Sequence, residues 1–245
     1  MNIVASIEAR MTSTRLPGKV LMTILDKPIL EYIIERLQCS KYITDIVVAT
    51  TTNEQDNAIQ SLCNQLHIKC YRGNEDDVLG RLVDAHQYMN TNIIVEITGD
   101  SPVIDPAIVD RTISEYLNNT VDYVSNTIQK TFPIGMRSQV FSFDLLKQIS
   151  TLTQDKEDRE HVTSYIYRNP SVYKILNVSA NNDEFWPDLR LTLDYPEDFE
   201  VIKFIIEQIY PEKNTFGLND IIQLMKKYPE IVQLNSQCIQ KIIRS

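Results

Sequence analysis

The sequence is short of positive charge, and that shortage excludes two classes of partner. Lys and Arg number 24 against 33 Asp and Glu, which gives a formal net charge of -9. A general nucleic-acid coat or a protein that binds anionic membranes needs net positive potential, so neither nucleic acid nor a membrane is expected as a partner. A phosphorylated substrate still fits, provided that basic residues gather at one place.

Signals for export, membrane insertion and cysteine chemistry are missing as well. No apolar run approaches the length of a membrane span. The apolar start of the chain has no basic region and meets Glu8 and Arg10 at once, which argues against a signal peptide. The four cysteines show no C-x-x-C spacing. These absences predict a cytoplasmic protein with reduced cysteines.

The first half of the chain alternates strand-like and helix-like patterns. Short apolar runs alternate with segments whose apolar residues recur at helical spacing, which is typical of βαβ units. The expected strands are 3–7, 46–49, 68–71, 93–97 and 122–124, and the expected helices are 28–37, 58–66, 78–89 and 106–117. The prediction is an α/β fold, a single Rossmann-like domain whose mostly parallel sheet is flanked by helices on both faces.

The second half is less regular. The expected strands are 139–143, 173–178 and 189–193, and the expected helices are 159–167, one that starts at Pro196, 218–227 and 236–243. No stretch rich in Gly, Pro or Ser divides the chain. We therefore predict one domain over residues 1–210 and a C-terminal helical extension over residues 211–245, packed on that domain or on a partner subunit.

The loop after the first strand is the most informative segment. Residues 9–19 carry three cations, Arg10, Arg15 and Lys19, together with three hydroxyls and Gly18. In an open α/β sheet, ligands bind beyond the carboxyl ends of the strands, where this loop must lie, and its cations can neutralise a polyphosphate. The Walker loop and the G-x-G-x-x-G motif are both absent. By charge alone, an ordinary solvated loop explains these residues about equally well.

Six motifs, in order along the chain, carry a resemblance to a known family. They read A-R-M-T-S-T-R-L-P-G-K-V-L at 9–21, Y-R-G-N-E-D-D-V-L-G-R at 71–81, I-T-G-D-S-P-V-I-D-P at 97–106, D-Y-V-S-N-T at 122–127, D-R-E-H-V-T and Y-I-Y-R-N-P within 158–170, and L-T-L-D-Y-P-E-D at 191–198. Together they resemble the CTP-dependent cytidylyltransferases related to spore-coat polysaccharide synthesis. That family groups with the synthetases of CMP-activated sugar acids, such as acylneuraminate and 3-deoxy-manno-octulosonate cytidylyltransferases.

The resemblance implies a nucleotidyltransferase domain and assigns its nucleotide side. Arg10, Arg15 and Lys19 are expected to hold the triphosphate of CTP, and Arg10, Lys19 and Asp100 form the expected catalytic group. The nucleotide-binding residues that the resemblance implies are Ala9, Arg10, Ser13, Arg15, Lys19, Arg72, Gly73, Asp77 and Thr98. Judged by its pattern alone, the acidic run 75–77 is a solvated turn and helix cap.

Two aspartates that follow predicted strands suit a metal site. Asp100 and Asp194 are both expected at the carboxyl edge of the sheet. Nucleotidyl transfer uses Mg²⁺ to bridge phosphate oxygens, and Mg²⁺ takes one or two carboxylates with phosphate oxygens and water. An aspartate before a proline-initiated helix can instead be its N-cap, which is the interpretation we favour for Asp105 and Asp198. The positions of Asp100 and Asp194 in the family motifs make them the expected magnesium ligands.

The second half is expected to bind the group that is activated. Arg159, His161 and Tyr165 lie on one predicted helix, where residues 161 and 165 share a face at i, i+4 spacing. They could hold a carboxylate or a phosphate of the acceptor. The alternative is a salt-bridged surface helix, since acidic residues surround them in the sequence.

The sequence departs from its family between residues 135 and 143. Relatives commonly read G-L-D-V-E-V-F-S-F, whereas this chain reads G-M-R-S-Q-V-F-S-F, so Arg137 and Gln139 replace two acids. On a strand these two side chains face the same way. A cation and an amide in place of two acids favour an anionic acceptor. We therefore predict that Arg137 and Gln139 join Arg159, His161 and Tyr165 in binding the acceptor.

The overall prediction is a CTP-dependent cytidylyltransferase that uses Mg²⁺, converts a sugar acid or similar anion to its CMP-linked form, releases pyrophosphate and forms a homodimer. A metal-dependent glycosyltransferase has a related layout, but such enzymes usually carry an Asp-x-Asp motif, which this chain lacks. A catalytically silent nucleotide-binding module is the other alternative. It predicts a degraded basic loop or metal site, and both are intact in the sequence.

Overall fold

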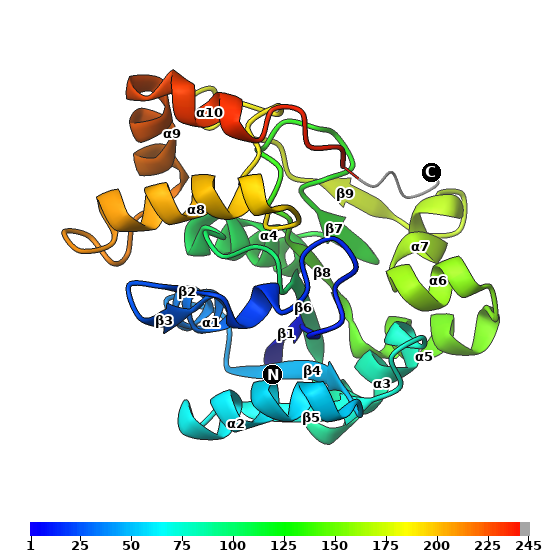
Figure 1. Cartoon of the computed structure of the whole chain (residues 1–245). Coiled ribbons are helices and arrows are strands. Elements are labelled where there is room, and N and C mark those ends of the chain that lie inside the picture. Colours follow the sequence, from blue (N-terminus) through cyan, green and yellow to red (C-terminus); the bar gives the residue numbers. More distant parts are fainter. Residues whose placement is uncertain (241–245) are drawn as a thin grey trace.

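A seven-stranded sheet forms the centre of the molecule (Figure 1). The computed structural model describes residues 1–240. The strands are β1 (Ile3–Glu8), β4 (Asp45–Thr51), β5 (Lys69–Gly73), β6 (Ile93–Thr98), β7 (Tyr123–Ser125), β8 (Gln139–Ser142) and β9 (Ile175–Asn177). They lie in the order β5-β4-β1-β6-β8-β7-β9, in which β8 runs antiparallel to both neighbours and the other pairs are parallel. The predicted, mostly parallel sheet is confirmed.

The sequences of the central strands explain their position. β1, β4 and β6 read I-V-A-S-I-E, D-I-V-V-A-T-T and I-I-V-E-I-T, and their side chains are almost all buried. Apolar, β-branched runs of this kind suit parallel strands that are covered on both faces. Ser6 and Glu96 interrupt two of the runs, and as register partners they face the same side of the sheet.

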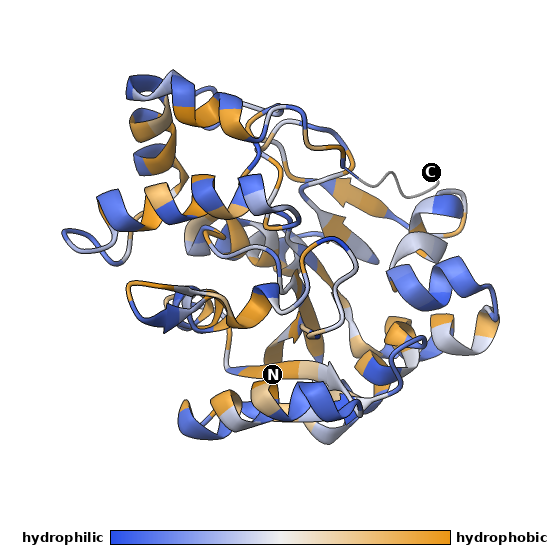
Figure 2. Ribbon diagram, in the orientation of Figure 1, coloured by the Kyte–Doolittle hydropathy of each residue, from blue (hydrophilic) through white to orange (hydrophobic). Residues whose placement is uncertain are grey.

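Helices cover both faces of the sheet, as predicted. One face packs against α1 (Ile29–Gln38), α2 (Asn57–Gln65), α4 (Pro106–Asn118), α8 (Pro196–Ile209) and α9 (Leu218–Lys227). The other packs against α3 (Val78–Tyr88), α5 (Phe143–Leu152), α6 (Lys156–His161) and α7 (Ser164–Arg168). Figure 2 shows apolar strands at the centre and helices that alternate between apolar and polar residues, which is the pattern of amphipathic cover.

Two aspartates stabilise helix starts: Asp105 is the predicted N-cap of α4, whereas Asp198 is the third residue of α8, whose N-cap is Tyr195. Asp105 precedes α4, and its Oδ1 accepts a hydrogen bond from the Ala107 backbone N–H at 2.8 Å. Asp198 lies in the first turn of α8, and its Oδ2 accepts from the backbone N–H of Asp194 at 2.9 Å and of Tyr195 at 3.0 Å. Both carboxylates satisfy backbone donors that a helix start leaves free.

Two elements of the second half differ from the prediction. Residues 189–193 form no strand of the sheet; they make an isolated parallel bridge between Arg190 and Ile134. The predicted helix 159–167 is divided into α6 and α7, because Val162 has a φ of 48°, which a continuous helix cannot contain. α5, which follows β8 directly, was not predicted.

The C-terminal helices extend the main core. The apolar side chains of α9, including Leu218, Ile221 and Met225, join the cluster that covers one sheet face. The helix expected at 236–243 does not form in its described part, since α10 (Pro229–Leu234) ends before it; positions 241–243 lie outside the described residues. Across residues 1–240, no helix is both long and apolar enough to cross a membrane.

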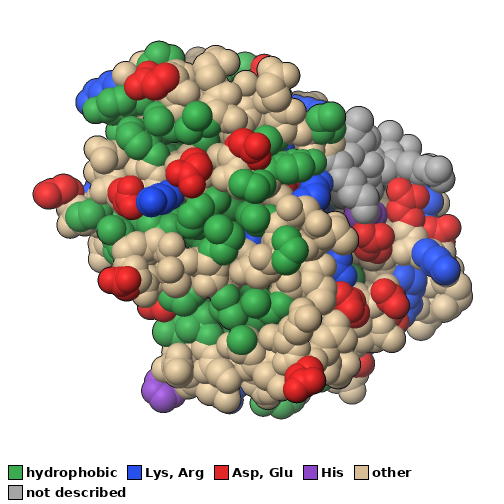
Figure 3. Space-filling model, in the orientation of Figure 1, with side chains coloured by type: hydrophobic (Ala, Val, Ile, Leu, Met, Phe, Trp, Pro, Cys, Tyr) green, Lys and Arg blue, Asp and Glu red, His purple; other side chains and the backbone are tan. Residues whose placement is uncertain are grey.

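Hydrophobic side chains gather on one face, over α8 and the short hairpin of β2 (Thr23–Ile24) and β3 (Lys27–Pro28) (Figure 3). Phe199 and Phe204 of α8 are half-buried against the core. The homodimer stays a prediction.

Candidate active site

The two predicted magnesium ligands lie next to each other at the carboxyl edge of the sheet. Asp100 follows β6, and Asp194 comes directly after the extended segment 189–193, two residues before α8. The backbone N–H of Leu193 donates to the carbonyl of Asp100 at 2.9 Å, which fastens the two segments together. Gly135 lets a third segment pack against residues 189–193: its φ is 103°, and a Cβ there would lie 2.5 Å from the backbone of Leu191.

One ammonium group joins both carboxylates. Lys19 Nζ lies 3.2 Å from Asp100 Oδ2 and 2.9 Å from Asp194 Oδ1. Burial alone would lower the pKa of Lys19, but the two carboxylates raise its pKa above the usual value. Burial would likewise raise the pKa of Asp100, but the Lys19 charge lowers it. The cation therefore stays charged and Asp100 stays ionised at neutral pH.

The two arginines of the basic loop take different positions. Arg15 Nη2 lies 2.7 Å from Asp194 Oδ1, the oxygen that also contacts Lys19. Arg10 instead pairs with Glu75, in the loop after β5, at 3.2 Å, and its side chain is 40% exposed. The structure thus brings Arg15 and Lys19 to the aspartates, and Arg10 to the opposite side of the loop.

The other predicted residues of this loop shape its backbone. Ala9 is buried, and Ser13 Oγ accepts from the Leu16 N–H at 3.5 Å. The buried Asp56, which we did not predict, also holds this loop in place. Its Oδ1 accepts a hydrogen bond from the Met11 N–H at 2.8 Å.

Arg72 and Gly73, which the resemblance assigns to the nucleotide, support the neighbouring loop. Arg72 donates from Nε to the carbonyl of Thr51 and from Nη2 to that of Asn53, both at 2.8 Å. A Cβ at Gly73 would lie 2.9 Å from Cγ of Arg81, so the glycine gives that side chain room. Their contact with a base stays a prediction.

Thr98 and Asp77, the other two predicted nucleotide-binding residues, contact different groups. Thr98 Oγ1 donates to Asp100 Oδ1 at 2.6 Å, which puts it beside the aspartate pair. Asp77 caps α3 through the Gly80 N–H at 2.9 Å and accepts from Arg159 Nε at 2.7 Å. Burial would raise the pKa of Asp77, but the hydrogen bond from Arg159 lowers it.

A pair of acids lies beside this edge. Glu8 ends β1 and Glu96 lies on β6, on the same sheet face. Burial, reinforced by the Glu96 charge, raises the pKa of Glu8 from its usual 4.5 to about 8. Ionising both of two neighbouring buried acids is energetically unfavourable, so Glu8 is largely protonated at neutral pH.

Arg137 and Gln139 lie next to these acids. Arg137 Nη2 is 3.5 Å from Glu96 Oε1, and this carboxylate raises the pKa of Arg137 although burial would lower it. Gln139 is fully buried, and its Oε1 accepts from the hydroxyls of Tyr123, Tyr167 and Thr163. The charge of Arg137 is therefore already matched inside the protein, and among residues 1–240 the buried Nε of Arg137 has no hydrogen-bond partner.

We expect Glu8→Gln to change how stability depends on pH. With a pKa of about 8 in the folded chain against 4.5 in the unfolded chain, Glu8 takes up a proton on folding between these two pH values. The free energy of unfolding of the native protein therefore falls as pH rises from about 4.5 to about 8, whereas Gln has no proton to lose. The gain in melting temperature from Glu8→Gln should grow between about pH 5 and pH 9. Glu200→Gln, on the exposed side of α8, is the control, and a gain that ignores pH would contradict the assignment.

The predicted acceptor residues of the second half do not share one helical face. Arg159 lies on α6 and pairs with Asp77. His161 ends α6, whereas Tyr165 lies on α7, where its ring packs edge-on against Tyr173 with the centroids 6.3 Å apart. The left-handed residue between the two helices makes the i, i+4 argument wrong. A role in acceptor binding stays a prediction.

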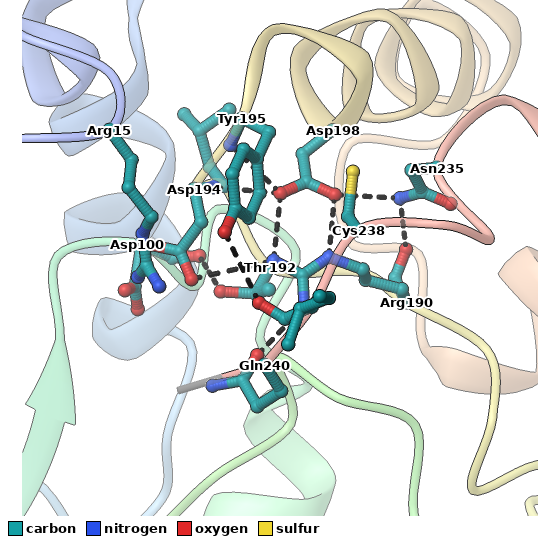
Figure 4. A network of polar contacts seen from close by, with 12 residues as sticks. Arg15, Asp100, Arg190, Thr192, Asp194, Tyr195, Asp198, Asn235, Cys238 and Gln240 are labelled. Atoms are coloured by element: carbon teal, nitrogen blue, oxygen red, sulfur yellow. Dashed lines mark hydrogen bonds and ion pairs between the residues drawn. The ribbon is translucent and has the colours of Figure 1, made fainter. Parts of the chain in front are cut away.

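Sequence reasoning missed two sets of residues at the site. Arg190 lies behind Asp194, with Nη2 3.4 Å from its Oδ2, in a network of buried polar contacts (Figure 4). Its position four residues before Asp194 carried no recognisable signal. The acids Glu8 and Glu96 did carry one, since an acid within an apolar strand needs a partner or a proton.

The aspartate pair suits a magnesium ion. Asp100 and Asp194 lie close enough for one Nζ to contact both. Within residues 1–240, no group of three or more His, Cys, Asp or Glu side chains is arranged to hold a metal. Mg²⁺ prefers one or two carboxylates completed by phosphate oxygens and water, so two aspartates match a metal that arrives with a nucleotide.

Fold and site together define a class of protein. An open, mostly parallel α/β sheet carries cations and two aspartates beyond the carboxyl ends of its strands. This arrangement can bind a metal and a polyphosphate at once, as an α/β nucleotidyltransferase does.

Comparison with known proteins gives the family. A family model described as cytidylyltransferase matches residues 4–227. A spore coat polysaccharide biosynthesis protein of Bacillus subtilis is 32% identical over 235 residues, which are 94% of this chain and 96% of that one. A solved cytidylyltransferase of Leptospira borgpetersenii has a TM-score of 0.87 at 31% identity and covers 99% of this chain and 98% of its own. A 3-deoxy-manno-octulosonate cytidylyltransferase of Geobacter sulfurreducens is 34% identical over 119 residues, 49% of this chain and 47% of that one.

The chain belongs to the cytidylyltransferase family and is a nucleotidyltransferase. The resemblance inferred from the six motifs is confirmed.

Proposed function

We propose that this enzyme transfers the cytidylyl group of CTP to a hydroxyl of a small anionic acceptor, of the sugar-acid class, and releases pyrophosphate. The observation that carries the proposal is the Lys19 ammonium held between Asp100 and Asp194 at the carboxyl edge of the sheet. The family supports the cytidylyl group. The 3-deoxy-manno-octulosonate relative supports a sugar acid as acceptor.

The proposed reaction is an in-line displacement at the α-phosphorus. The acceptor oxygen forms a bond to that phosphorus while the bond to the bridging oxygen of pyrophosphate breaks, and pyrophosphate leaves with the electron pair. The hydroxyl proton passes to solvent. Negative charge on the phosphoryl oxygens is offset by Arg15 and Lys19 at one end of the loop and by Arg10 at the other. Catalysis then consists mostly of positioning and electrostatic stabilisation.

Mg²⁺ is the proposed cofactor, with Asp100 and Asp194 as its protein ligands. When bound, it supplies Lewis-acid stabilisation of the phosphate oxygens and of the leaving group. Lys19 and Arg15 contact these carboxylates. The oxygens of a triphosphate attract the same two cations, so nucleotide binding frees carboxylate oxygens for the metal.

Pyrophosphate release tests the proposal directly. The protein is incubated with Mg²⁺, each of the four NTPs in turn, and a panel of sugar acids, their phosphates and neutral sugars. We expect pyrophosphate with CTP and a sugar acid, and a larger thermal stabilisation by CTP than by UTP, ATP or GTP. Equal stabilisation by all four nucleotides would contradict cytidine specificity. Turnover of a nucleotide sugar without pyrophosphate would indicate a glycosyltransferase, and binding without turnover would indicate a silent module.

The proposed contact between Arg137 and an acceptor carboxylate has its own test. A charge-assisted hydrogen bond is worth roughly 1.5–3 kcal/mol, so Arg137→Ala is expected to raise the acceptor KM by about one to two powers of ten and to leave the CTP KM nearly unchanged. The double variant Arg137→Ala/Glu96→Gln is the control, because it removes the buried carboxylate that the single variant leaves unpaired. An unchanged acceptor KM in both variants would show that Arg137 pairs with Glu96 and does not bind the acceptor.

A further inference from the structure

The C-terminal segment returns to the catalytic edge of the sheet (Figure 4). Residues 235–240 follow α10 and contact the extended segment that carries Asp194. Gln240 Oε1 accepts from Arg190 Nη1 at 2.7 Å. Asn235 is buried, and its Nδ2 donates to the carbonyl of Arg190 at 3.1 Å and to Asp198 Oδ1 at 2.9 Å. The end of the described chain thus holds Arg190 from two sides.

Arg190 in turn faces the catalytic aspartate. Its Nε lies 2.8 Å from Asp198 Oδ1 and its Nη2 lies 3.0 Å from Asp198 Oδ2, in a two-point contact, and the same Nη2 lies 3.4 Å from Asp194 Oδ2. The other oxygen of Asp194 faces Lys19 and Arg15. Because Asp198 offsets the charge of Arg190, this arginine can orient Asp194 without cancelling the charge that a metal needs.

Tyr195 makes a second connection between the C-terminal segment and the site. Its hydroxyl donates to the carbonyl of Ile239 at 3.4 Å. The guanidinium groups of Arg15 and Arg190 lie 5.3 Å and 5.6 Å from the centre of its ring, within the range of a cation–π contact. The C-terminal segment therefore reaches both the aspartate and the basic loop through one intermediate side chain each.

We propose that Asn235, Ile239 and Gln240, in the segment after α10, are positioning residues of the catalytic site. Gln240 and Asn235 fix Arg190, which orients Asp194 toward a metal–triphosphate complex, and Ile239 fixes Tyr195, which supports Arg15. The inference rests on the proposed function of the same site, and these residues act through others rather than on the substrate. Loss of the Gln240 contact should weaken binding of the metal–nucleotide complex and leave the chemistry intact once that complex is bound.

The test compares Gln240→Ala with Gln237→Ala, an exposed glutamine of the same segment whose side chain is outside the network. Mn²⁺ replaces Mg²⁺ as the probe, and its binding in the presence of CTP and the absence of acceptor is read from the loss of the free-ion EPR signal. Removing an outer partner of a metal ligand typically weakens metal binding about 10- to 100-fold, which is the range expected for Arg190→Lys. Gln240→Ala should shift Mn²⁺ binding in the same direction by less, and Gln237→Ala should not shift it.

Steady-state kinetics and unfolding complete the test. In Gln240→Ala, the Mg²⁺ concentration for half-maximal turnover should rise while kcat at saturating Mg²⁺ and the melting temperature stay near native values. Native-like Mn²⁺ binding by Gln240→Ala, or a lowered melting temperature with unchanged Mn²⁺ binding, would overturn the inference. A native protein that releases no pyrophosphate with any nucleotide would refute the proposed function, while the Mn²⁺–CTP comparison would still decide the role of the segment.

Discussion

Replacing Asp194 by Asn is expected to lower turnover by about 100- to 1000-fold, the range found when one preorganised electrostatic contact to a transition state is lost. Asp194 is almost fully buried, and its two oxygens face Lys19 and Arg15 on one side and Arg190 on the other. Asn keeps the shape but removes the charge that holds a divalent metal. The fold should survive, because Asp198 still pairs with Arg190 and Asp100 with Lys19.

The same loss is expected for Asp100→Asn, and the measurement is kcat at saturating Mg²⁺ together with the melting temperature. Asp188→Asn, an exposed aspartate near the extended segment, is the matched control. Near-normal turnover in either site variant would show that its carboxylate has only a structural role. A helix cap is not an available explanation for Asp194, since the caps at this end of α8 are made by Asp198.

Lys19→Met is expected to change turnover and metal binding in opposite directions. Turnover should fall by about 100-fold or more, because a preorganised cation at the triphosphate is lost. Metal binding without nucleotide should tighten, because the ion no longer competes with an ammonium that contacts both carboxylates. The melting temperature should fall in a chelator, where Asp100 and Asp194 have lost the ammonium between them, and recover with Mg²⁺.

Calorimetric titration with Mn²⁺ in the absence of nucleotide measures metal binding, and pyrophosphate release measures turnover. Lys41→Met, at an exposed lysine, controls for the loss of one positive charge. If Lys19→Met weakened Mn²⁺ binding, the two aspartates could not be the metal ligands in the arrangement described.

Much of the nucleotide side could be predicted from the sequence, because it depends on short-range rules. The apolar runs of β1, β4 and β6 determine a buried parallel sheet, and the topology of such sheets puts the loop at 9–19 and Asp100 at one edge. Asp194 needed the family motif. It reaches the edge through backbone bonds of an extended segment that pairs with no strand of the sheet.

The acceptor side was harder to predict, because its contacts are tertiary. Val162 carries no turn signal, yet its left-handed backbone divides the expected helix and lets Thr163 donate to Gln139. The pairing of Arg137 with Glu96 joins a loop to a strand far away in the sequence. Side-chain pattern alone could not reveal that the charge of Arg137 already has a partner.

The ion pair between Asp77 and Arg159 has a consequence for the construction of hybrid enzymes. It ties the start of α3, next to the loop of Glu75, to α6 in the second half of the chain. A chimera that takes its second half from a relative inherits that relative's residue at 159 but keeps Asp77, which loses its partner wherever that residue is not Arg. In such a hybrid the Asp77 carboxylate would be left unpaired between the two parts, so the exchanged part should include residue 77 as well.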